Sequence, residues 1–179
     1  ERIAYTLGES VLRDSFYFCD LLPKSKGKLE GGEVEDSPIK FGTDGWRGII
    51  AQDFTFDNVR ACAQGVADYL KQVGLANRGL IVGYDTRFAS EDFAAAAAEV
   101  VAGNGIKVYL CPRATPTPVI SYGILEQKAG GAIIITASHT GKLERLQIET
   151  LIARTLATGE VQQMPLAEAL APGLVEYLD

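Results

Sequence analysis

The chain has few of the residues that build metal sites and disulfides. Its only histidine is His139, and its three cysteines, Cys19, Cys62 and Cys111, lie far apart with no Cys-x-x-Cys pair. A histidine-rich metal centre within this chain is therefore excluded, and neither a thiolate zinc site nor a disulfide framework is supported. Unpaired cysteines are typical of a reducing compartment, so we expect a cytoplasmic protein.

Long apolar runs and an excess of positive charge are also absent. No stretch approaches the roughly 18 apolar residues of a transmembrane helix, and the first residues lack the basic and apolar regions of a secretory signal. The chain carries 17 lysines and arginines against 23 aspartates and glutamates, a net charge of −6. This balance argues against nucleic acid and membranes as partners. It is compatible with a small phosphorylated ligand, which needs only one local basic pocket.

The size and composition are those of a globular protein. The chain has 179 residues, of which 47% are hydrophobic, and this is enough for one sizeable core and an appendage. Residues 24–38 are charged and rich in glycine, as linkers are, so we place a boundary near Ser37. The sequence predicts an N-terminal extension and linker (1–38), one domain (39–159) and a tail (160–179) that leads toward a missing second domain.

Apolar strands alternate with amphipathic helices after this boundary. Thr55, Ser90 and Thr117 are suited to cap helices, because their side chains bind the free amides of a first turn. Strands that alternate with helices predict a layered α/β sheet with helices on both faces, and ligands of such sheets bind at the carboxyl ends of strands. The all-apolar strand 131–136 is expected at the centre. The predicted order is helix 55–74, strand 80–82, helix 90–103, strand 108–110, helix 117–128, strand 131–136 and helix 142–157.

Two segments combine glycine with arginine. In Phe41-Gly-Thr-Asp-Gly-Trp-Arg-Gly48 the glycines permit a tight backbone that brings amides and a guanidinium near an anion. Arg47 can bind a phosphate through two parallel hydrogen bonds; the alternative is a glycine turn with a surface arginine. Gly83-Tyr-Asp-Thr-Arg87 directly follows a predicted strand, where a site is favoured. Alternatively, an ion pair between Asp85 and Arg87 only stabilises the turn.

Two further segments follow strands. Thr136-Ala-Ser-His139 places Ser138 as a nucleophile would lie, with His139 beside it for proton transfer or phosphate binding; the alternative is a strand-end serine and a half-exposed histidine. A serine hydrolase is not indicated, because the Gly-x-Ser-x-Gly motif is absent around Ser138. The glycine motifs of P-loops and dinucleotide sites are absent too. Thr115-Pro-Thr-Pro118 is typical of a turn that begins a helix.

Taken together, these four segments resemble a known family. Their order and intervals are similar to those of the α-D-phosphohexomutases, the phosphoglucomutase/phosphomannomutase family, over about residues 39–139 and more loosely over the tail. The resemblance implies the first of that family's four domains, a three-layer α/β/α sandwich. It also implies an enzyme that moves phosphate between C1 and C6 of a hexose phosphate, with a hexose 1,6-bisphosphate as activator.

The resemblance implies a role for each matching residue. Ser138 matches the serine that is phosphorylated and passes its phosphoryl group to the sugar, and His139 matches the neighbouring active-site histidine. Arg47 matches the basic loop that lines the phosphoserine. A phosphoserine oxygen is one ligand of Mg²⁺ in the family, so Ser138 is the only metal-binding residue implied here. The phosphate-binding residues implied are Thr43, Asp44, Gly45, Arg87 and Thr136. Since a phosphoserine carries about −1.5 to −2 charges, it needs cations such as Arg47 and a divalent metal.

The chain also departs from the family pattern. Where the family continues after the histidine with Asn-Pro and a loop ending in Asn-Gly-x-Lys, this chain has Thr140-Gly-Lys142, so Lys142 is not equated with the family's lysine. No Asp-x-Asp occurs, although the family's metal loop in its second domain has that pattern. We therefore predict that the chain alone is inactive and associates with the remaining mutase domains or with itself. The alternatives are a non-catalytic module with this fold that binds a phosphate or phosphosugar or has a regulatory role, and a structural fragment without function of its own.

Overall fold

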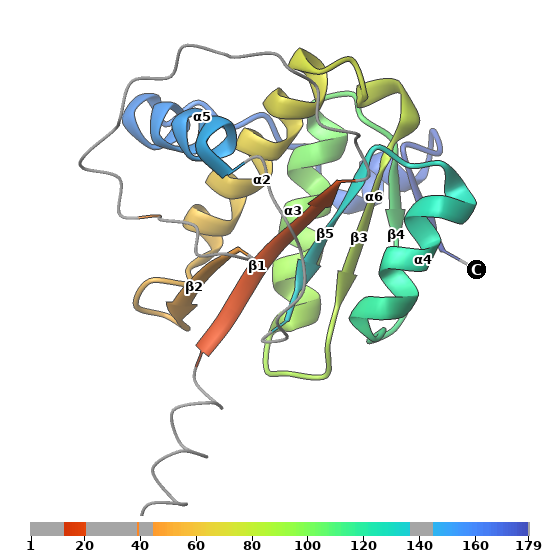
Figure 1. Cartoon of the computed structure of the whole chain (residues 1–179), viewed down its shortest axis with the longest axis horizontal. Helices are drawn as coiled ribbons and strands as arrows, with labels where there is room; N and C mark the ends of the chain where they lie inside the picture. Colours follow the sequence, from red (N-terminus) through yellow and green to blue (C-terminus); the bar gives the residue numbers. More distant parts are fainter. Residues whose placement is uncertain (1–12, 21–38, 40–44, 137–144, 179) are drawn as a thin grey trace, which may run out of the picture.

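The computed structural model describes residues 13–20, 39, 45–136 and 145–178, and its centre is a six-stranded sheet (Figure 1). The strands lie in the order β2-β1-β5-β3-β4-β6. The strands β5, β3, β4 and β6 run parallel, and β1 is antiparallel to both of its neighbours. The bounds are β1 Arg13–Asp20, β2 Trp46–Ile49, β3 Leu80–Tyr84, β4 Val108–Leu110, β5 Gly131–Ile135 and β6 Val175–Tyr177.

Helices pack on both faces of this sheet. Helix α4 covers one face, whereas α3 covers the other together with α2 and α6, and α5 packs on the outside of α2 (Figure 1). The predicted α/β/α sandwich is therefore confirmed. No helix in the described part of the chain is long and apolar enough to cross a membrane. The bounds are α2 Phe56–Gln72, α3 Ser90–Gly103, α4 Thr117–Gln127, α5 Arg145–Thr158 and α6 Leu166–Leu170, with a 3₁₀ turn η1 at Ala76–Arg78.

The central strand β5 is held from both faces. All five of its residues are buried, as a strand between two helical layers requires. Ile133 and Ile135 belong to the hydrophobic cluster on the α3 side, whereas Ala132 and Ile134 belong to the cluster on the α4 side. Full burial of one isoleucine side chain stabilises the fold by about 1.5–3 kcal/mol. The carboxyl end of β5, where Thr136 follows, is therefore placed by the core itself.

The helix starts agree with the prediction at α2 and differ at α3. Thr55 caps α2, and its Oγ1 accepts a hydrogen bond from the amide of Asn58 at 3.3 Å. The prediction that Ser90 caps α3 is wrong: the cap is Ala89, in a left-handed conformation with φ 60°, and Ser90 is the first helical residue. The Ser90 hydroxyl donates to Asp85 instead. Ser90 is already in helical conformation, so it is one residue too late in the chain to be the N-cap.

The start of α4 differs by one residue from the prediction. The N-cap of α4 is Pro116 rather than Thr117, which is already helical. Pro118 then lies in the first turn, where a missing amide hydrogen leaves no hydrogen bond unmade. Helix α5 is described from Arg145 onward. The predicted start at Lys142 lies outside the described residues.

The sheet takes strands from both sides of the predicted domain. β1 lies before the boundary at Ser37 and β6 lies in the tail, which also bonds to α3. The amides of Met164 and Leu166 donate to the backbone oxygen and to Oε1 of Glu99, at 3.0 and 3.1 Å. The boundaries themselves stay a prediction. The region before Ser37 gave no strand signal because its apolar residues follow no clean period.

Candidate functional site

The loops after β3, β4 and β5 leave the sheet at one edge. The amide of Asp85, the residue after β3, donates to the backbone oxygen of Ile135 at the end of β5, at 3.1 Å. The amide of Thr115, in the loop after β4, donates to the backbone oxygen of Tyr84 at 2.8 Å. These bonds continue the sheet beyond its strands. They bring the end of β5 beside the Asp85 loop, and the end of β3 beside the Thr115 turn.

Arg47 lies at the same edge, on the far side of β1. One residue of β1 is aligned both with Ile135, the last residue of β5, and with Trp46 of β2. Arg47 is the next residue of β2, so it lies one residue beyond the carboxyl end of β5. Trp46 is buried and its ring stacks on Phe54 at 4.9 Å between centroids. Because side chains alternate along a strand, this anchor turns the exposed side chain of Arg47 away from the core.

Asp85 and Arg87 form one hydrogen-bonded unit in the loop after β3. The Oδ1 atom of Asp85 accepts from the amide of Arg87 at 3.0 Å and from the hydroxyl of buried Ser90 at 3.1 Å. The Oδ2 atom lies 3.5 Å from Nε of Arg87. The ion pair that the sequence suggested is therefore present. Ala89, in the same loop, has the left-handed backbone conformation that costs a residue with a side chain about 1–3 kcal/mol.

The structure brings some predicted site residues together and leaves others undescribed. Thr136 is buried directly after β5, and Arg47 and Arg87 lie at the same edge of the sheet. Gly45 precedes β2 with φ 145°, a conformation open to glycine and costly for other residues. The remaining predicted residues, which lie outside the described part of the chain, are Thr43, Asp44, Ser138 and His139.

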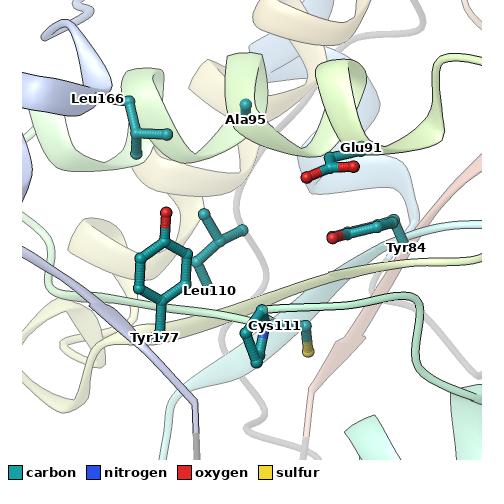
Figure 2. Close-up of a pocket in the computed structure, with 8 residues that line it drawn as sticks. Tyr84, Glu91, Ala95, Leu110, Cys111, Leu166 and Tyr177 are labelled. Carbon is teal, nitrogen blue, oxygen red and sulfur yellow. The ribbon is translucent and has the colours of Figure 1, made fainter.

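A cavity of about 200 Å³ opens between α3, α6 and the ends of β3, β4 and β6 (Figure 2). Figure 2 shows the Tyr84 hydroxyl directed toward the Glu91 carboxylate, with Tyr177 on the opposite side. The pKa of Tyr84 is raised above its ordinary value, mainly by burial and secondly by the negative charge of Glu91. None of the residues that line the cavity is basic. A phosphate group is therefore better served at the edge that carries Arg47 and Arg87.

The structure adds two features that the sequence analysis did not find. The sequence suggested the Asp85–Arg87 pair but not the hydrogen bond from Ser90 to Asp85, for which the Asp-x-Arg-x-x-Ser spacing was the available signal. The cavity wall includes Tyr177, which the tail brings beside Tyr84 through the pairing of β6 with β4. No local pattern could have linked these two tyrosines. In the described part of the chain, no three His, Cys, Asp or Glu side chains gather as a metal site.

Comparisons with known proteins connect this arrangement to a family. The family model that describes the phosphoglucomutase/phosphomannomutase α/β/α domain I matches residues 38–144. A phosphoglucomutase of Staphylococcus epidermidis is 33% identical over 142 residues, which cover 76% of this chain and 24% of the relative. A glucose 1,6-bisphosphate synthase of Mus musculus is 37% identical over 144 residues, which cover 69% of this chain and 23% of the relative. The chain thus spans about a quarter of the length of these relatives.

A solved structure shares the fold. The crystal structure assigned to a phosphomannomutase of Thermus thermophilus superposes with a TM-score of 0.64 and 32% identity, and the match covers 80% of this chain and 33% of that one. The family model matches more than half of the present chain and includes the Arg47, Arg87 and Thr136 segments. This chain therefore belongs to the phosphoglucomutase/phosphomannomutase family, in which it corresponds to the α/β/α domain I.

Proposed function

We propose that this chain is the phosphoserine-bearing domain of a phosphohexomutase and that Ser138 carries the phosphoryl group. The observation that supports the proposal most is the position of β5. Its carboxyl end leads through Thr136 to Ser138, and it lies between the Asp85–Arg87 loop on one side and the strands that carry Arg47 on the other. Thr136 thus follows a strand that has the Arg87 loop on one side and the β1–β2 pair, with Arg47 on β2, on the other.

The charges of this edge suit a phosphorylated serine. Phosphoserine carries about −1.5 to −2 charges near neutral pH, and Arg47 and Arg87 supply two positive charges. Arginine also presents two parallel N–H donors, whose geometry matches two oxygen atoms of a phosphate. Phosphoryl transfer depends mainly on positioning and on neutralising charge. We infer that these arginines supply part of both, and that Thr43, Asp44 and Gly45 contribute backbone amides.

The proposed reaction exchanges one phosphate ester for another. The hydroxyl oxygen of Ser138 attacks a phosphorus of a hexose 1,6-bisphosphate, the bond from that phosphorus to the sugar oxygen breaks, and the proton of Ser138 ends on the sugar oxygen. In the reverse step, the phosphoserine gives its phosphoryl group to a free hydroxyl of a hexose monophosphate and recovers a proton. We propose His139 as the group that carries the proton. After both steps, phosphate has moved between C1 and C6.

Mg²⁺ is expected from the family resemblance, but the described residues do not supply a site for it. Asp85, the acidic residue nearest to the end of β5, is already bonded to Arg87 and Ser90. No cluster of three metal-binding side chains occurs within the described ranges. An ion held by the phosphoserine would need its other ligands from elsewhere. We propose accordingly that the chain accepts phosphate once and does not turn over hexose phosphates by itself.

The proposal is tested by intact-mass spectrometry of the full chain before and after incubation with glucose 1,6-bisphosphate and Mg²⁺. The names of the relatives, a phosphoglucomutase and a glucose 1,6-bisphosphate synthase, support this choice of probe. We expect one added phosphate, which peptide mapping assigns to Ser138 and which Ser138→Ala abolishes. A chain that binds the bisphosphate but gains no phosphate is a binding module, and the proposed function is then wrong.

A further inference from the structure

We propose that Asp85 is a positioning residue that orients Arg87 toward a phosphate group bound beyond the carboxyl end of β5, and this inference rests on the proposed function. The Asp85–Arg87 pair does more than close a turn. One carboxylate binds both the backbone and the side chain of the same arginine: Oδ1 accepts from the Arg87 amide at 3.0 Å and Oδ2 lies 3.5 Å from Arg87 Nε. Both the position and the direction of the guanidinium are thereby constrained.

Asp85 is itself fixed from two other directions. Its amide donates to the backbone oxygen of Ile135 at 3.1 Å, which ties the loop to the end of β5. Its Oδ1 also accepts from the Ser90 hydroxyl at 3.1 Å, and Ser90 is fully buried at the start of α3. The carboxylate is thus held by the strand that leads to Ser138 and by a helix of the core. Because Arg87 is bonded to Asp85, its position relative to β5 is fixed as well.

A contribution to stability alone does not explain why these contacts hold the Asp85–Arg87 pair. The side chains of Arg87 and Asp85 keep 30% and 27% of their exposure, and pairs so open to water contribute little to stability. The two explanations also predict opposite effects on phosphate binding. A negative charge that does not orient Arg87 repels phosphate, so its removal strengthens binding. A carboxylate that orients Arg87 favours phosphate, so its removal weakens binding.

The decisive variant is Asp85→Asn in the full chain. The asparagine oxygen still accepts from the Arg87 amide and from Ser90, so the turn is kept while the charge that pairs with Nε is lost. Asp57→Asn is the matched control, because it also removes a carboxylate charge that pairs with an arginine, Arg60, at 3.3 Å on α2. The Nε–H signal of Arg87, identified by its loss in Arg87→Lys, is followed by NMR during titration with inorganic phosphate. Phosphorylation of Ser138 by glucose 1,6-bisphosphate is measured on the same samples.

We expect inorganic phosphate to shift the Arg87 signal in the natural sequence and in Asp57→Asn. In Asp85→Asn the dissociation constant should rise about tenfold, the loss typical of one hydrogen bond to a charged group. Phosphorylation of Ser138 should slow by a similar factor. Unchanged amide spectra elsewhere would show that Asp85→Asn is folded. Equal or tighter phosphate binding by Asp85→Asn overturns the positioning role.

The two proposals fail in different ways. If phosphate shifts the Arg87 signal through Asp85 but Ser138 gains no phosphate, the positioning role stands as that of a phosphate-binding site and the proposed function is wrong. If Ser138 is phosphorylated at the same rate in both proteins, the proposed function stands and the positioning role is wrong. If Arg87 does not respond to phosphate in the natural sequence, the positioning role is also wrong.

Discussion

Ile120 of α4 occupies the space that a side chain at Gly83 of β3 would need. A Cβ atom placed at Gly83 would overlap the Cδ1 and Cγ1 atoms of Ile120 and would lie 3.2 Å from Sγ of Cys111. The glycine that opens the Gly83–Arg87 segment therefore serves the packing of α4 against the sheet. The residue proposed to bind phosphate, Arg87, comes later in the segment.

We predict that Gly83→Ala destabilises the fold by about 1–3 kcal/mol, the usual cost of an extra methyl group in a filled core. Ile120→Val removes the Cδ1 atom that the new methyl group meets. The double variant should therefore be more stable than the sum of the two single effects allows. Urea unfolding of the four proteins measures this coupling. Strictly additive effects would contradict the predicted overlap.

Asn104 joins three elements, and its loss should be costly. Its side chain donates to Gln64 Oε1 on α2 at 2.8 Å and to the backbone of Val100 on α3 at 2.9 Å, and both amide side chains are buried. The same Gln64 oxygen accepts from the amide of Gln162 in the tail at 3.0 Å. We predict that Asn104→Ala destabilises the fold by about 1–3 kcal/mol, because it removes the hydrogen bonds that the two buried amide side chains of Asn104 and Gln64 exchange.

This effect should be visible in the tail as well as in the global unfolding. Amide hydrogen exchange at Gln162 should accelerate in Asn104→Ala. Asn58→Ala is a control, because Asn58 bonds on the exposed side of the same helix α2. It should leave exchange at Gln162 unchanged. If Asn104→Ala does not affect Gln162, the network does not hold the tail.

Arg47 should matter for phosphorylation and little for stability. Its side chain is exposed, and exposed substitutions usually change the free energy of unfolding by less than about 0.5 kcal/mol. We predict that Arg47→Ala slows the phosphorylation of Ser138 by glucose 1,6-bisphosphate about tenfold or more, because a charge-assisted bond to phosphate is lost. The phosphorylation rate of Arg47→Lys should lie between those of the natural sequence and Arg47→Ala, since lysine keeps the charge but lacks the two parallel donors of arginine. Arg154→Ala, an exposed site on α5, is the control. Equal rates in all four proteins would remove Arg47 from the site.

Cys62 should make the fold sensitive to alkaline pH. Complete burial raises the pKa of the Cys62 thiol well above its ordinary value. The folded state then keeps the proton that the unfolded state releases above about pH 8.5, so the stabilising effect is fully present below that pH and is lost as pH rises. Cys62→Ala should lower stability at neutral pH by leaving a small cavity, but should lose less stability between pH 7 and pH 10 than the natural sequence. Urea unfolding at both values measures the difference. Equal losses would contradict the prediction.

The elements that the sequence predicted well are those specified by local pattern. Helix α2 has a capping threonine, apolar residues at helical spacing and Gly74 beyond its end, and strand β5 is wholly apolar. The edge that gathers Arg47, Arg87 and Thr136 also followed from a general rule, because ligands of parallel sheets bind at the carboxyl ends of strands. Local pattern and this rule together were enough to predict the fold class and the edge of the sheet where these residues lie.

The features that the sequence did not predict depend on contacts between distant segments. Ser90 has the residue type of a helix cap, but a carboxylate five residues earlier captures its hydroxyl. Strands β1 and β6 are recognisable only through their partners β5 and β4. Tyr177 reaches the cavity beside Tyr84 by way of β6. Tertiary pairing decides each of these, and no periodicity within the segment reports it.

The position of β1 has a consequence for the order in which the fold forms. β1 lies between β2 and β5, and it is made first on the ribosome, whereas β5 is made near the other end of the domain. Until β5 emerges, one side of β1 has unpaired backbone amides and carbonyls, which are open to pairing with another nascent chain. Contacts between such distant segments also fold slowly. We therefore expect the yield of folded protein to depend on how long β1 waits for β5 during synthesis.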